Sequence, residues 1–246
     1  MKIIKHLYKN FSNFETLNNE FVGNPPFPLI VLDNFLPNEV ALKLFNESKK
    51  INSKCWKTFS RNDSLMYECN KLDVAPEAFK FVNEMQSGLG MQWITNLTGI
   101  KDLIPDPYLT GAGYSKIPTN ADLKVHTDFN WNDELKLHRM LSFIVYLNPE
   151  WKDNYGGNLK FYDFQKENVV QDIIPKFNRA VFWRYHKKGF HGCPGPINSP
   201  ENIDRTSFRL FFYVSNATYN ENDRPHRSLY WYDKDLNEPY DIPSRK

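Results

Sequence analysis

Two histidines and one aspartate in this chain have the types and the spacing of a metal-binding triad. His126 and Asp128 are separated by one residue, and His191 lies far along the chain. Residues i and i+2 of an extended segment point to the same side, so His126 and Asp128 can bind one ion from a single strand end. Two imidazoles and one carboxylate that leave open positions on Fe(II) are the usual ligands of non-haem iron oxygenases. The pattern therefore predicts iron-dependent oxygen chemistry.

Four other histidines must be weighed against this assignment. His186 follows the same predicted strand as His191 and is its main rival for the third ligand position. His138 could also compete, but no second ligand lies near it in the sequence. His6 and His226 lie in terminal regions, where we expect solvated side chains. The spacing alone therefore leaves His186 open as an alternative to His191.

Short segments rich in branched and aromatic residues predict a mainly β fold. Gly, Pro and Asn separate four such segments, which are 141–149, 158–164, 179–183 and 206–214. Several strands at short spacing indicate a sandwich or barrel of the jelly-roll kind. Earlier in the chain we predict a strand at 29–32 and helices from Pro37 to about Ser48, from Pro76 to Gln86, and from Met91 to Leu97. The expected class is α+β, with helices flanking a β core.

Alternation along the last predicted strand separates an apolar face from a polar one. The apolar face is ordinary core and consists of Thr206, Phe208, Leu210, Phe212 and Val214. The other face carries Arg205, Ser207 and Arg209 toward the side that could hold the triad, and Tyr146 can point the same way. A guanidinium fork and a phenol match a carboxylate ligand. We therefore predict an acid-binding pocket anchored by Arg205. Arg209 is the alternative anchor, a substrate contact or one half of an ion pair, and plain core packing is the alternative for Tyr146.

Several of these residues recur in the order and approximate spacing of one known family. The motifs are His126-x-Asp128, Tyr146-Leu147-Asn148-x-x-Trp151, Gly156-Gly157-x-Leu159, His191 and Arg205-x-Ser207. Over about residues 110–215 the chain resembles the Fe(II)/2-oxoglutarate dioxygenases related to prolyl 4-hydroxylases. The resemblance implies a double-stranded β-helix core. It also favours His191 over His186.

The resemblance assigns roles to residues of this chain. His126, Asp128 and His191 would be the catalytic metal ligands, and Arg205 with Tyr146 and Ser207 would hold the distal carboxylate of 2-oxoglutarate. Tyr114 would lie near the chelating end of that co-substrate. The implied reaction uses Fe(II) and O2, decarboxylates 2-oxoglutarate to succinate and hydroxylates a C–H bond of an acceptor, with ascorbate as a candidate reductant. The ligand Asp128 argues against halogenation, because the related halogenases have a small residue at this position.

Bulk properties fit an intracellular enzyme. The 246 residues include 31 basic and 29 acidic side chains, so the net charge of +2 indicates no affinity for nucleic acid. The three cysteines lack C-x-x-C spacing, which argues against a disulfide framework or a zinc ribbon. We find no signal sequence or bilayer-spanning segment, and we expect a cytoplasmic protein without a membrane partner. We predict one domain over 1–246, with support elements at 1–105, the β core at 106–216 and a polar extension, laid over the core or partly mobile, at 217–246.

Two other classes of function remain open. A cupin-type metal enzyme or a zinc hydrolase could use the triad without 2-oxoglutarate, but that leaves the acid pocket unexplained. A non-catalytic jelly-roll module could use its 6 Trp, 13 Tyr and 19 Phe to bind a carbohydrate or a protein, although core packing is the ordinary use of such residues. The acceptor is not identified by these motifs: a prolyl residue of a protein or peptide and a small metabolite both fit. Loops 53–72 and 184–204 are the predicted acceptor-facing surface.

Overall fold

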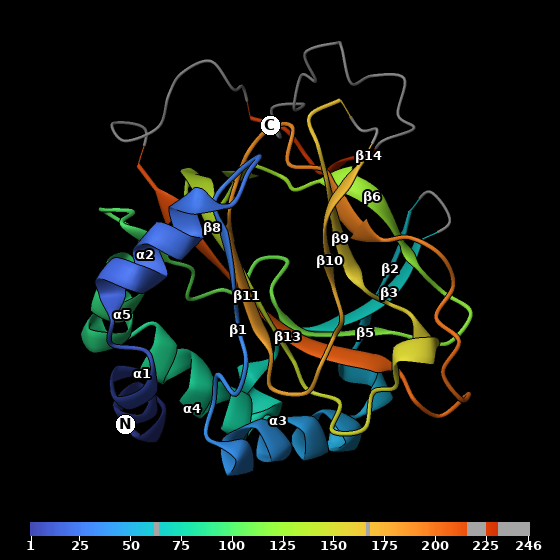
Figure 1. The fold of residues 1–246 in the computed structure, drawn as a ribbon. Coiled ribbons are helices and arrows are strands. Elements are labelled where there is room, and N and C mark those ends of the chain that lie inside the picture. Colours follow the sequence, from blue (N-terminus) through green and yellow to red (C-terminus); the bar gives the residue numbers. More distant parts are fainter. Residues whose placement is uncertain (62–63, 166–167, 216–224, 231–246) are drawn as a thin grey trace.

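Two antiparallel sheets face each other, and helices cover the outer side of the larger one (Figure 1). The computed structural model describes residues 1–61, 64–165, 168–215 and 225–230. The helices are α1 (Lys2–Asn10), α2 (Phe14–Gly23), α3 (Asn38–Lys50), α4 (Pro76–Met85) and α5 (Gly88–Thr98). Short 3-10 turns lie at Ser53–Cys55, Leu72–Val74 and Asp153–Tyr155.

The larger sheet supplies the platform of the fold. Its order is β1-β11-β8-β13-β5-β3-β2, while β4 pairs with β13 and β7 pairs with β8. The strand bounds are β1 Leu29–Leu32, β2 Lys57–Arg61, β3 Ser64–Cys69, β4 Ile104–Pro105, β5 Gly113–Ile117, β7 Trp131–Asn132, β8 Leu137–Tyr146, β11 Ala180–Arg184 and β13 Arg205–Val214. The long strands β8 and β13 lie side by side at its centre, with Ser207 opposite Tyr146.

The smaller sheet closes the other side of the core. Its order is β10-β9-β12-β6-β14. The bounds are β6 Leu123–Thr127, β9 Leu159–Tyr162, β10 Val169–Ile173, β12 His191–Cys193 and β14 Leu229–Tyr230. Every pairing of the described strands in both sheets is antiparallel. The predicted α+β class with a double-stranded β-helix core is therefore confirmed.

Period-two alternation explains how β13 serves both sides of the larger sheet. Phe208, Leu210 and Phe212 are fully buried in the main apolar core, which lies between this sheet and the helices. Phe81 of α4 meets Phe208 edge to face, with 5.2 Å between ring centroids. The opposite face of the strand is directed between the sheets, which leaves it free to carry polar groups. Two smaller apolar clusters, one around Phe161 and one around Ile197, fill the space between the sheets on either side of a pocket.

The helices follow local signals and long-range caps. Helix α4 begins at Pro76, and Glu47 of α3 accepts hydrogen bonds from its first free backbone N–H groups, those of Glu77 and Ala78, at 2.7 and 2.9 Å. Helix α5 ends at Gly99, whose φ is 69°. The three predicted helices are confirmed, although α5 begins three residues earlier than expected. Helices α1 and α2 were not predicted.

A β-bulge interrupts the pairing of the two central strands. Phe212 pairs with Leu141, whereas Tyr213 pairs with Arg139, so Met140 is an extra residue in β8. A bulge reverses the alternation of side chains beyond it. Residues of β8 before Met140 therefore face the opposite way from what simple alternation predicts.

The predicted division of the chain at residue 106 does not follow the sheets. Strands β1, β2, β3 and β4 all precede that boundary and all belong to the larger sheet. Beyond residue 216, the described residues 225–230 add β14 to the smaller sheet, while the rest of the predicted extension lies outside the described residues. Within the described ranges, no helix has the length and apolar character required to cross a bilayer. The single-domain assignment stays a prediction.

Candidate active site

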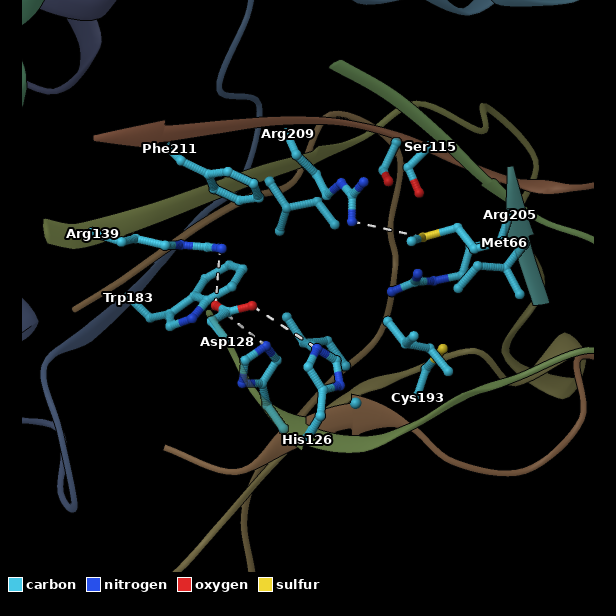
Figure 2. Close-up of a pocket in the computed structure, with 17 residues that line it drawn as sticks. Met66, Ser115, His126, Asp128, Arg139, Trp183, Cys193, Arg205, Arg209 and Phe211 are labelled. Carbon is cyan, nitrogen blue, oxygen red and sulfur yellow. Dashed lines mark hydrogen bonds and ion pairs between the residues drawn. The ribbon is translucent and has the colours of Figure 1, made fainter. Parts of the chain in front are cut away.

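Strands β6 and β12 bring the predicted triad together between the sheets. His126 and His191 are opposite each other in the pairing of these strands, and Asp128 lies just past the end of β6. One ligand atom from each residue lies within 4.8 Å of the others, and all three residues are buried. His126 Nε2 is 3.9 Å from Asp128 Oδ1, and His191 Nε2 is 3.6 Å from Asp128 Oδ2 (Figure 2).

The backbone fixes the state of both imidazoles. His126 Nδ1 is 2.8 Å from the carbonyl oxygen of Lys124, and His191 Nδ1 is 2.8 Å from that of Gly189. A carbonyl only accepts, so each Nδ1 donates and each Nε2 keeps a lone pair for a metal. Burial, assisted by the neighbouring His191, lowers the pKa of His126 to about 4. The two imidazoles and the carboxylate fit Fe(II), which these three residues would hold.

Aromatic rings hold each imidazole from the side. Tyr230 of β14 stacks on His126 at 5.3 Å between centroids, with an angle of 29°. Phe161 stacks on His191 at the same distance and angle, and Trp183 meets His191 edge to face. Strand β14, which lies near the end of the sequence, therefore helps to pack the site.

The third ligand is held by Arg139, a residue that the sequence analysis did not assign to the site. Arg139 Nη2 donates to Asp128 Oδ2 at 3.0 Å, and Ser142 Oγ donates to the same oxygen at 3.2 Å. Burial alone would raise the pKa of Asp128, but Arg139, the two imidazoles and the Ser142 hydroxyl together outweigh it, and the pKa falls to about 2. The carboxylate is therefore ionised at neutral pH.

Arg205 occupies the opposite side of the pocket (Figure 2). It is 4% exposed, its Nη2 donates to the Tyr146 hydroxyl at 3.1 Å, and its Cζ lies 4.8 Å from the centroid of that ring. Burial raises the pKa of Tyr146 to about 12, against the effect of Arg205, so the phenol is neutral. Arg205 Nε has no hydrogen-bond partner, and no carboxylate of the described residues forms an ion pair with Arg205.

Gly157 makes room for the guanidinium stem of Arg205. A Cβ on Gly157 would lie 2.9 Å from Arg205 Cδ and 3.3 Å from the side chain of Ile197. The φ of Gly157 is 72°, a conformation that residues with a side chain rarely adopt. The second glycine of the Gly156-Gly157 motif is therefore needed at this place for both steric and conformational reasons.

Arg209 lies on the same face but has a protein partner. Its guanidinium pairs with Glu68 of β3, and its Nη1 lies 3.6 Å from Met66 Sδ. The ion pair that the sequence analysis gave as one alternative for Arg209 is thus present, although its Nε is left without a partner. This arrangement makes Arg205 the cation of the pocket that lacks a carboxylate.

The pocket itself joins the two ends of the site. Its empty volume is about 490 Å³, part of it open to solvent. The lining includes the three candidate metal ligands and both β13 arginines, together with Ser115 and Ser207. An anion that bridges Arg205 and a metal at the triad would lie inside it.

The structure contradicts the prediction for Tyr114. Its hydroxyl lies within hydrogen-bond distance of two acceptors on the helix side of β5, the carbonyl oxygen of Leu44 at 3.0 Å and Glu47 Oε1 at 2.9 Å, which share its one hydrogen. Ser115, the next residue, lines the pocket instead. Because neighbouring residues of a strand point to opposite faces, Tyr114 cannot reach the chelating end of a co-substrate.

The remaining histidines lie outside the triad. His186 stacks on Phe164 with 4.6 Å between centroids, and His138 packs against Trp131. Neither belongs to the group of candidate ligands in the described part of the chain. The expectation of a solvated His226 is wrong: it is 8% exposed, and its Nε2 is 2.7 Å from the Tyr185 hydroxyl.

Among jelly-roll proteins, two histidines and a carboxylate in this arrangement mark the class of non-haem iron oxygenases. Residues 112–213 match the family model of the 2OG-Fe(II) oxygenase superfamily. Residues 112–213 are therefore similar to the oxygenase domain of this superfamily, whose members use Fe(II), 2-oxoglutarate and O2, and the triad fits the iron of that chemistry. This finding does not favour the cupin-type enzyme, the zinc hydrolase or the non-catalytic binding module.

Two curated relatives match part of the chain. It is 32% identical to prolyl 3-hydroxylase OGFOD1 of Mus musculus over 130 residues, which are 51% of this chain and 22% of the mouse protein. The protein of the same name from Xenopus laevis is 32% identical over 104 residues, or 41% of this chain and 18% of its own length. The matches thus span about a fifth of each relative.

Solved structures share the fold. A Trichoplax adhaerens prolyl hydroxylase in complex with a peptide of hypoxia inducible factor has a TM-score of 0.62 and 17% identity, covering 88% of this chain and 97% of that one. A Pseudomonas putida prolyl-4-hydroxylase has a TM-score of 0.57 and 17% identity, covering 81% of this chain and 99% of the other. At such identities the likeness establishes the fold alone.

Proposed function

We propose that this chain is an Fe(II)- and 2-oxoglutarate-dependent hydroxylase of a prolyl residue in a protein or peptide. The oxygenase class rests on the family match, and the roles of individual side chains and the acceptor are the proposed part. The observation that carries the proposal is Arg205, a buried guanidinium without a carboxylate partner, across the pocket from the triad. A buried charge of this kind is costly unless a ligand of opposite charge compensates it.

Two groups of pocket residues would bind the co-substrate, one at each of its ends. His126, Asp128 and His191 would hold iron, and Arg205 would bind the distal carboxylate of 2-oxoglutarate with the neutral phenol of Tyr146 and the nearby Ser207. When bound, iron supplies the activation of O2 that converts 2-oxoglutarate to succinate and CO2, with one oxygen atom passing to the succinate and one to the acceptor. The side chains of Ile144 and Leu159 add apolar surface to the lining of this pocket.

A peptide or protein acceptor is supported by the names of the relatives. OGFOD1 is a prolyl 3-hydroxylase, and the Trichoplax protein is a prolyl hydroxylase in complex with a peptide. In this chain, the β2–β3 hairpin places Met66 in the pocket lining, which agrees with the predicted acceptor-facing loop 53–72. The second predicted loop, 184–204, contributes His191, Gly192 and Cys193 to the same pocket.

Succinate formation tests the enzymatic part of this proposal. Anaerobically iron-loaded protein is exposed to O2 with 2-oxoglutarate, and wild type is compared with His126→Ala, Arg205→Ala and His186→Ala. We expect turnover to fall to the enzyme-free background in His126→Ala and to be strongly reduced in Arg205→Ala, while His186→Ala stays active. Turnover that survives in His126→Ala would reject the triad as the iron site.

The acceptor is tested with proline-containing peptides in the same reaction. We expect a mass gain of one oxygen atom on proline, coupled to succinate formation. Parallel reactions with and without ascorbate test whether this reductant sustains turnover, as we propose. Succinate formation that is stimulated by free amino acids or sugars, and never by a peptide, would replace the prolyl acceptor with a small molecule and leave the oxygenase intact.

A further inference from the structure

Arg139 is a buried cation that the bulge in β8 directs toward the metal ligands. Simple alternation with Ser142, Ile144 and Tyr146 would place it on the helix side of the sheet, but the extra residue Met140 reverses its direction. Arg139 is 1% exposed and lines the pocket. Bulges next to active sites commonly re-aim one side chain, so the function of this side chain is the question the bulge raises.

The contacts of Arg139 converge on one oxygen of Asp128. Its Nη2 donates to Asp128 Oδ2 at 3.0 Å, and its Nε and Nη2 donate to Ser142 Oγ at 3.1 and 2.9 Å. Ser142 Oγ in turn donates to Asp128 Oδ2 at 3.2 Å. Two linked donors therefore hold Oδ2, while the carboxylate still faces both imidazoles, with Oδ2 3.6 Å from His191 Nε2 and Oδ1 3.9 Å from His126 Nε2.

The guanidinium is itself fixed in place by aromatic rings. Its Cζ lies 3.4 Å from the ring centroid of Phe211 and 4.6 Å from that of Phe129. Figure 2 shows Arg139 beside Phe211 with its terminal nitrogen directed at Asp128. A cation packed between rings and bonded to a serine has few other orientations, so it can hold the carboxylate in one rotamer.

We propose that Arg139 is a positioning residue for the metal centre, which holds Asp128 through Oδ2 and so fixes the orientation in which the carboxylate would meet the ion. This inference rests on the proposed function, because it assumes a metal at the triad. Arg139 does not touch the reacting atoms; it acts through Asp128. Groups that orient a ligand typically change metal affinity or activity by about 10- to 100-fold when they are lost.

Metal binding without 2-oxoglutarate or O2 tests this role directly. The dissociation constants of Mn(II) and Co(II) are measured by calorimetry for wild type, Arg139→Met, Arg139→Lys and Ser142→Ala. We expect about 10- to 100-fold weaker binding in Arg139→Met, partial recovery in Arg139→Lys, and a smaller loss in Ser142→Ala. The matched control is Arg179→Met, which removes an arginine that is bonded to Asp33 through two nitrogens outside the pocket and should leave metal affinity unchanged.

The absorption spectrum of the Co(II) protein separates positioning from simple stabilisation. If Arg139 fixes the orientation of the Asp128 carboxylate, its loss lets the carboxylate rotate, and the visible bands should change in position or intensity even in variants that fold normally. Wild-type affinity and an unchanged spectrum in folded Arg139→Met would overturn the inference. If Arg139→Met does not fold, Arg139→Lys and Ser142→Ala decide it by the same two readouts. A wild-type protein that binds neither metal would instead reject the proposed function.

Discussion

The two ends of the pocket differ in how their charges are balanced. At the triad, the chain supplies the partners of its own polar atoms: Asp128 is bonded to Arg139 and Ser142, and each imidazole Nδ1 meets a backbone carbonyl. At the other end, Arg205 is equally buried, but a neutral tyrosine is its one side-chain partner among the described residues. The first end is organised before any ligand arrives, and the second is completed only by an anion.

This difference predicts opposite stability changes for the two buried arginines. Arg139→Met leaves the Asp128 carboxylate buried without its partner and should lower the free energy of unfolding by about 3 to 5 kcal/mol. Arg205→Met removes an uncompensated charge and should raise it by about 1 kcal/mol in the absence of 2-oxoglutarate. Urea denaturation of the metal-free proteins measures both. A loss of stability in both variants would remove the distinction between the two ends.

Without 2-oxoglutarate, Arg205→Met should have the larger free energy of unfolding. With 2-oxoglutarate bound, the wild type should have the larger one. The variant loses the charge-assisted bonds to the distal carboxylate, and we expect its affinity for 2-oxoglutarate to fall by about 100-fold, or about 2.7 kcal/mol. At a co-substrate concentration of about 100 times its dissociation constant, the wild type gains about 2.7 kcal/mol of stability, and the variant gains little. Metal affinity measured alone should be unchanged. If 2-oxoglutarate stabilised wild type and Arg205→Met equally, Arg209 would be the residue that binds its distal carboxylate.

Tyr146→Phe tests the smaller share of the phenol at the Arg205 end. The substitution removes one hydrogen bond to the guanidinium and keeps the ring that packs between the sheets. We expect the KM for 2-oxoglutarate to rise by about 5- to 10-fold, which corresponds to about 1 kcal/mol, with little change in kcat. An unchanged KM would leave Tyr146 with core packing as its role.

The ion pair of Asp33 and Arg179 is partly exposed, so we expect it to contribute less to the free energy of unfolding than either buried arginine of the pocket. Hydrogen bonding to Arg179 lowers the pKa of Asp33, whose side chain is 38% exposed. Because its folded pKa is depressed, this stabilisation is present above the unfolded value of about 3.9 and disappears as the pH falls through the folded value. Asp33→Asn should cost less than about 1 kcal/mol near neutral pH. Urea denaturation should show the difference shrinking below about pH 4 and in high salt.

The group of candidate metal ligands could be predicted from the sequence because its geometry depends on local rules. Residues i and i+2 of a strand share a face, which placed His126 and Asp128 together, and the same alternation placed Arg205 and Ser207 toward them. Arg139 could not be found in this way, because the bulge at Met140 reverses the alternation and leaves no local signal. The error for Tyr114 is the converse: alternation would have excluded it, but its assignment came from a resemblance in position.

The helices also show that only elements with local sequence signals could be predicted. Helices α3, α4 and α5 have apolar periodicity and terminal signals in their own sequences, so they were predicted. Helix α1 begins without a side-chain cap of its own and is instead capped by Glu84 of α4, which accepts from the backbone N–H groups of Lys2, Ile3 and Ile4. Such a partner, distant in the sequence, is not visible from local patterns. The burial of His226 likewise depends on the pairing of β14 with β6.

The contact between Gly157 and Arg205 has a consequence for how sequences of this kind diverge. Any side chain at 157 would collide with the stem of Arg205, so the two positions should not vary independently. Homologues that move the anchoring cation to another strand are released from the steric part of this constraint, so that only the contact with Ile197 and the positive φ then favour glycine at 157. Joint substitution of these two positions would therefore serve as a genetic marker that separates oxygenases anchored through this arginine from those that bind their co-substrate differently.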